Sequence, residues 1–209
     1  MNPVREFLED TQPNIEYYLL VTGAAIIALF GILIDNIAVL IAAMIVAPLI
    51  QPIIVAAYGL ASGKYVYIGR AAKTFGLSIL AVVVVTILGV AVFHFVAVPS
   101  EDRVFISFIP EPVSALVIAF VGGIFATLGI FSKRIDSIIV GIGIAVSLMP
   151  PLVASSIGIS AGWSGLALRG TTIFGLNVLG IFVGSTLMLF LMRKNLFNFR
   201  RYLEENVTE

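Results

Sequence analysis

Six long runs of predominantly apolar residues, separated by short polar breaks, make up most of this chain. A helix needs ~20 mostly apolar residues to cross the hydrocarbon core of a bilayer. Strands of a membrane barrel alternate apolar and polar residues over ~10 positions, whereas these runs are continuously apolar. The sequence therefore predicts an all-α polytopic membrane protein with six transmembrane helices. The predicted spans are residues 15–34, 37–62, 74–98, 113–131, 137–160 and 171–192.

Composition agrees with a membrane location. Of the 209 residues, 60% are hydrophobic and 11% are charged, whereas a soluble domain carries about 25% charged residues. Six spans leave no room for a soluble domain of ordinary size, so we expect a single membrane domain over 1–209 with the lipid bilayer as its main partner. The chain has no cysteine, and we expect no cofactor, no metal and no nucleic-acid partner. Its parts are a cytoplasmic N-terminus (1–14), repeat 1 (15–98), repeat 2 (113–192) and a cytoplasmic tail (193–209).

The Lys and Arg residues predict the orientation, because cytoplasmic loops of membrane proteins carry an excess of them. With the N-terminus inside, ten Lys and Arg residues fall in cytoplasmic segments, and only Arg103 and Arg169 fall in outer loops. We therefore expect a multi-pass protein of the cell membrane with both termini cytoplasmic.

The two halves of the chain resemble each other. Shifting the sequence by 99 positions aligns 52–84 with 151–183 and gives nine identities in 33 positions. The matches include Arg70 with Arg169 and Gly63 with Gly162. Matches of arginine and glycine are less expected by chance than apolar matches in a chain of this composition. Each repeat holds three predicted spans, an odd number, so the second copy must enter the membrane inverted. Inverted repeats of this kind are a recurrent plan of secondary transporters, and a duplicated bundle that transports nothing is the alternative.

Prolines interrupt the second span of each predicted repeat. Proline lacks an amide hydrogen and clashes with the carbonyl four residues before it. The carbonyls of Met44, Pro48, Val146 and Ser147 should therefore lose their helical partner. Irregular backbone is tolerated in a membrane where it is buried or lines a wet cavity. The pattern predicts a substrate site at the bilayer midplane, with packing kinks as the alternative. Its candidate residues are Met44, Pro48, Gln51, Pro52, Val146, Ser147, Pro150 and Pro151.

Four charged residues at the predicted helix ends are candidates for gating. Topology places Asp35 and Arg169 on the outer face, and Asp136 and Arg70 on the inner face, in each case across the repeats. We hypothesise an outer ion pair between Asp35 and Arg169 and an inner one between Asp136 and Arg70; for the aspartates, helix capping is the alternative. No charged residue falls in the middle of a predicted span, and carbonyl and hydroxyl ligands then favour a cation or a neutral polar solute as cargo.

One short motif is typical of an enzyme. Residues 162–165 read Gly-Trp-Ser-Gly, the pattern around the serine of rhomboid proteases, and His94 is the only histidine. A serine nucleophile needs a base in hydrogen-bond contact, but this tetrapeptide falls in a predicted loop. We therefore expect no enzymatic activity.

Several apolar segments carry a family resemblance. The stretch from Asn36 to Pro52, followed by Arg70, resembles the membrane family catalogued as domain of unknown function 389, and so do Ala145 to Leu152 and Phe174 to Asn177. The resemblance covers about 30–190 and implies a fold and a membrane location, without an activity.

Together these features predict a transporter of a small ion or polar solute with a midplane site, in a homo-oligomer for which a dimer is the first guess. A channel-like pore and a membrane scaffold that binds partner proteins are the alternatives.

Overall fold

The computed structural model describes residues 13–92, 110–131 and 148–206. This part of the chain is helical and contains no strand. Its helices are α2 (Ile15–Leu33), α3 (Ile37–Val46), α4 (Ile50–Ser62), α5 (Tyr65–Val92), α7 (Pro112–Phe131), α9 (Met149–Ala161) and α10 (Ser164–Asn206).

The lengths of these helices suit a multi-pass membrane protein. Four of them, α2, α5, α7 and the first 29 residues of α10, are long and apolar enough to cross a bilayer, and α3 with α4 forms a fifth candidate that is bent by 44°. A sixth span at 137–160 stays a prediction, because only α9 of that region is described. With 13 residues, α9 is about 20 Å long at 1.5 Å per residue and is too short to cross alone.

Two of the predicted polar breaks are wrong. The expected loops at 63–73 and 161–170 are tight turns, because α5 begins at Tyr65 and α10 begins at Ser164. Each turn is made by a glycine in the left-handed region, Gly63 with φ 72° and Gly162 with φ 75°, which is the usual way to end a helix. The two glycines lie 99 positions apart, so the repeat extends to the backbone conformation.

The physical reason for this correction is that charged residues lower the hydropathy of a segment without breaking a helix. Arg70 and Lys73 lie inside α5, and Arg169 lies inside α10. A hydropathy criterion ends the span at these residues, but the backbone hydrogen bonds continue past them.

The first and third helices of each half run in the same direction and pack at the same register. Residues of α2 lie beside residues of α5 about 60 positions later, and α7 and α10 have the same offset. The contacts that show this are Tyr17 with Ser78, Leu29 with Gly89, Ala119 with Gly180, and Gly123 with Ser185.

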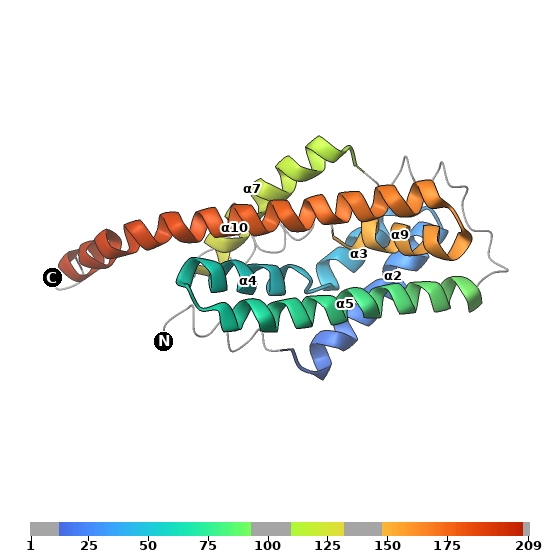
Figure 1. The fold of residues 1–209 in the computed structure, drawn as a ribbon, viewed down its shortest axis with the longest axis horizontal. Coiled ribbons are helices and arrows are strands. Elements are labelled where there is room, and N and C mark those ends of the chain that lie inside the picture. Colours follow the sequence, from blue (N-terminus) through green and yellow to red (C-terminus); the bar gives the residue numbers. More distant parts are fainter. Residues whose placement is uncertain (1–12, 93–109, 132–147, 207–209) are drawn as a thin grey trace.

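The long helices α5 and α10 run in opposite senses along the molecule. In Figure 1, α5 runs from the left end to the right end and α10 runs from right to left. The short helices α4 and α9 each pack against both of these long helices. Residues Met149–Gly158 of α9 are all buried, so α9 lies in the core of the bundle.

Candidate functional site

A pair of stacked aromatic rings joins α5 and α10. Phe75 of α5 and Phe174 of α10 have ring centroids 5.9 Å apart and an interplanar angle of 9°. They lie 99 positions apart, so each is the repeat equivalent of the other. A residue packed against its own equivalent lies on the two-fold axis that relates two copies. If the two halves are inverted copies, their two-fold axis passes through this ring pair, between α5 and α10.

The predicted interruption of the second span is confirmed in the first half of the chain. Asn36 begins α3, and its side-chain Oδ1 accepts hydrogen bonds from Ala38 N at 3.0 Å and Val39 N at 3.3 Å. The helix ends before Ala47, which is extended with φ −75° and ψ 115°. A residue before proline is driven to this conformation, so Pro48 is the cause of the break.

The structure also corrects which carbonyls are released. The amide hydrogen of Gln51 is donated to the carbonyl of Pro48 at 3.3 Å, so the predicted release of the Pro48 carbonyl is wrong. Pro48 itself has no amide hydrogen to donate to the carbonyl of Met44. The predicted release of the Met44 carbonyl therefore stays a prediction. Pro52 lies in the first turn of α4, where amide hydrogens have no helical acceptor.

In the second half, the prolines begin a helix. Pro150 and Pro151 occupy the first turn of α9, which starts at Met149. Proline is favoured at this place because its fixed φ suits a helix and its missing amide hydrogen is not needed there. Val146 and Ser147, the candidates for released carbonyls in this half, lie outside the described residues.

Polar side chains occupy equivalent positions on the buried faces of the long helices. Ser78 and Thr86 of α5 correspond to Asn177 and Ser185 of α10 at the shift of 99, and all four are buried. None of the four is among the predicted site residues. Comparing polar class instead of identity along the repeat alignment would have found them. The outward faces are apolar at equivalent positions, with Leu80, Val84 and Leu88 on α5 and Leu179, Val183 and Leu187 on α10.

Hydrogen bonds connect some of these buried groups to their neighbours. The Ser78 hydroxyl lies 3.0 Å from the Tyr17 hydroxyl of α2, and the Ser185 hydroxyl donates to the carbonyl of Gly123 in α7 at 3.1 Å. Thr86 is fully buried, and its hydroxyl has no hydrogen-bond partner among the described residues. An unsatisfied buried hydroxyl is costly, so the inward face of α5 keeps one polar group available.

Two further serines, near the predicted midplane site, have hydrogen-bonded hydroxyls, and that of Ser155 joins α9 to α10. The Ser155 hydroxyl of α9 lies 2.7 Å from the Thr171 hydroxyl of α10 and donates to the carbonyl of Ala167 at 3.0 Å. The Ser156 hydroxyl donates to the carbonyl of Leu152 at 2.8 Å within α9. Both hydroxyls therefore contribute to packing.

The charged candidates have a different arrangement from the predicted one. The ion pair that the structure gives Arg169 is with Glu111, at 2.9 Å between Nη2 and Oε1, and Glu111 was not among the candidates. The hypothesised pairing with Asp35 stays a prediction. Asp35 has a left-handed φ of 52° in the turn between α2 and α3, and the capping residue of α3 is Asn36. Asp136, the proposed partner of Arg70, lies outside the described residues.

The serine motif and possible metal ligands complete the candidates. Ser164 is exposed at the first position of α10, and His94 lies outside the described residues. Within the described ranges, no group of three or more His, Cys, Asp or Glu side chains could hold a metal ion.

Comparisons with known proteins give a family and one relative. The profile of the family described as "Domain of unknown function (DUF389)" matches residues 44–183. The uncharacterized protein MJ0678 of Methanocaldococcus jannaschii is 31% identical over 166 residues, which is 79% of this chain and 51% of that protein. The chain thus spans about half the length of this curated relative. No solved structure matches the chain.

Proposed function

The chain belongs to the DUF389 family of domains of unknown function, and on this premise we propose that it is a transporter that moves a small ion or polar solute across the cell membrane. Its plan would be six transmembrane helices in two inverted repeats, with both termini cytoplasmic. The transported species passes between the halves, near the two-fold axis.

The stack of Phe75 on Phe174 is the observation that supports this proposal most. The stack joins equivalent residues of the long helices α5 and α10, as a local two-fold axis between them would require, and these helices run in opposite senses. For two halves that thread a membrane in opposite senses, the axis lies in the membrane plane. Substrate sites of inverted-repeat transporters lie near the midplane at the repeat interface and include discontinuous helices, and the break between α3 and α4 is of this kind.

The buried polar residues favour transport over a scaffold. Polar groups inside a membrane protein are costly, and they face the bundle interior or a water-filled cavity. Ser78 and Asn177, with Thr86 and Ser185, place such groups at equivalent positions in both halves. A scaffold has no need for this equivalence, whereas a pathway that opens alternately to either side uses both halves in turn.

Cysteine cross-linking tests the two-fold axis. The chain contains no cysteine, so the double variant Phe75→Cys with Phe174→Cys introduces one defined pair. Mild oxidation should form a disulfide within one chain, detected as faster migration in a non-reducing gel. The control pair Leu80→Cys with Leu179→Cys lies on the outward faces and should not join within a chain. Equal cross-linking of both pairs would contradict the axis.

Flux measurements in liposomes test the function. Saturable uptake of an ion or polar solute supports a transporter, unsaturable uptake supports a pore, and no flux of any solute supports the scaffold. Pro48→Ala restores an amide hydrogen opposite the Met44 carbonyl and should lower flux about tenfold or more by joining α3 to α4.

Pro112→Ala is the matched control for this change. Pro112 is the first residue of α7, where a restored amide hydrogen has no helical acceptor. It is not a candidate site residue, so flux should change less than about threefold. A similar loss of flux in both variants would show that flux does not depend on the break between α3 and α4.

A further inference from the structure

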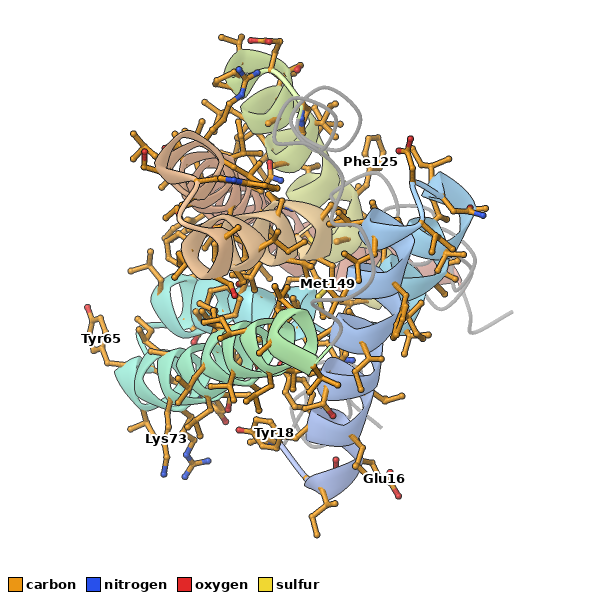
Figure 2. The ribbon with its side chains drawn as sticks, turned by 90° about the vertical axis from the view of Figure 1, so that its right-hand side faces the viewer. Glu16, Tyr18, Tyr65, Lys73, Phe125 and Met149 are labelled. Atoms are coloured by element: carbon orange, nitrogen blue, oxygen red, sulfur yellow. The ribbon has the colours of Figure 1, made fainter. Side chains whose placement is uncertain are left out.

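A basic face on α5 has no acidic partner in the described part of the chain. Arg70 and Lys73 are both exposed, and the structure gives neither of them an ion pair there. Figure 2 shows Lys73 projecting outward from α5, with Glu16 pointing in another direction beyond Tyr18. The arrangement differs from that of the repeat equivalent of Arg70, which is Arg169.

The two-fold axis sets the depth of these cations, and this step rests on the proposed inverted-repeat function. If the Phe75 stack lies at the midplane, Lys73 is two residues from it and Arg70 is five. These separations are about 3 Å and about 7.5 Å along the helix. Half of the hydrocarbon core is about 15 Å thick, so both positions lie within its depth. A charge at such a depth faces water, protein or a countercharge.

Arg169 shows how the fold meets this requirement in the second half. Its guanidinium is paired with the carboxylate of Glu111 at 2.9 Å, and Glu111 is the residue directly before α7. The residue directly before α2, the counterpart of α7, is Asn14. Its side-chain oxygen accepts from Tyr17 N at 2.8 Å and caps α2. The first half thus has an amide where the second half has a carboxylate.

The face around Arg70 and Lys73 also has open space. A methyl group added at Gly69 or at Gly76 would meet no atom within 4 Å. Both glycines lie on the exposed side of α5, next to the two cations. Bulky side chains therefore do not fill the space in which a ligand would bind.

We propose that Arg70 and Lys73 bind a soluble oxyanion, a solute with a carboxylate or phosphate group, in the position that Glu111 occupies beside Arg169. The planar guanidinium of arginine matches such groups with two parallel hydrogen bonds, and the ammonium of lysine adds a second charge. This site lies on the exposed face of α5, beside the proposed pathway between the halves.

Binding by the full chain in phosphatidylcholine nanodiscs tests the proposal, with phosphate, sulfate and succinate as probes in calorimetric titrations. The double variant Arg70→Gln with Lys73→Gln should weaken binding of at least one probe tenfold or more. The control Lys64→Gln removes an exposed cation from the turn before α5 and should change the affinity less than twofold. Lys73→Gln alone replaces the double variant if that variant does not fold.

Several outcomes would overturn the proposal. They are no binding of any probe, equal binding by the double variant, and binding of added phosphatidylglycerol without any soluble probe. Saturable flux of a cation without anion binding would refute the anion site and leave the transporter intact. Anion binding that depends on Arg70 and Lys73 without any flux would retain the site and refute the transporter.

Discussion

Replacing Gly184 by alanine measures how closely α7 and α10 pack. The two helices run side by side, and Gly184 faces the backbone of α7. A methyl group at this position would lie 3.0 Å from the carbonyl carbon of Phe120 and 3.3 Å from the amide nitrogen of Ile124, and closer still to the Phe120 carbonyl oxygen. Backbone atoms cannot rotate away as a flexible side chain can, so α7 must move.

The magnitude follows from a comparison with Gly175, nine residues earlier on the same helix. A methyl group there would meet nothing within 4 Å. Alanine is favoured over glycine inside a helix by about 0.8–1.0 kcal/mol, and this gain is common to both variants. Overpacking costs about 1–3 kcal/mol. The free energies of unfolding of Gly175→Ala and Gly184→Ala should therefore differ by about 1–3 kcal/mol, with Gly175→Ala the more stable.

Equilibrium unfolding by SDS in dodecylmaltoside micelles, followed by circular dichroism, gives both values in one solvent. The expected order is Gly175→Ala at or above the unsubstituted protein and Gly184→Ala below it. If the two variants agree within about 0.5 kcal/mol, α7 and α10 can separate without cost, and the close packing described here is wrong.

Three further predictions concern single contacts. A double-mutant cycle on Glu111→Gln and Arg169→Gln should give a coupling free energy of about 0.5–1 kcal/mol in the same unfolding assay, and no measurable coupling would contradict the ion pair. A cycle on Tyr17→Phe and Ser78→Ala should give about 0.5–1.5 kcal/mol for the hydroxyl contact; additive single effects would show that the hydroxyls do not interact. Asn36→Ala removes the cap of α3 and should cost about 1 kcal/mol, and unchanged stability would assign the start of α3 to another group.

The shift of 99 between the two halves reappears in the helix bounds because it depends on local signals. Gly63 and Gly162 align at the shift of 99, and both end a helix in the left-handed conformation. The bounds of α4 and α9, and the starts of α5 and α10, then coincide under the same shift. The expectation that Pro48 interrupts the second span holds for the same reason, since the effect of proline acts on its immediate neighbours.

Charged residues were the main source of error along the chain. Arg70 and Lys73 were taken as part of a loop, although they lie in α5. The free-energy cost of placing these charges in a membrane depends on the groups around them. The hydropathy of the local sequence carries no information on those groups.

The sequence by itself determined that this is a multi-pass helical membrane protein built from two related halves, because apolar runs, glycine turns and prolines act over a few residues. Only the tertiary structure decided that Phe75 stacks on its own equivalent Phe174 and that Arg169 pairs with Glu111. Such contacts join residues far apart in the chain. They depend on how each helix is rotated and at which register it packs, and side-chain packing across the whole bundle sets both.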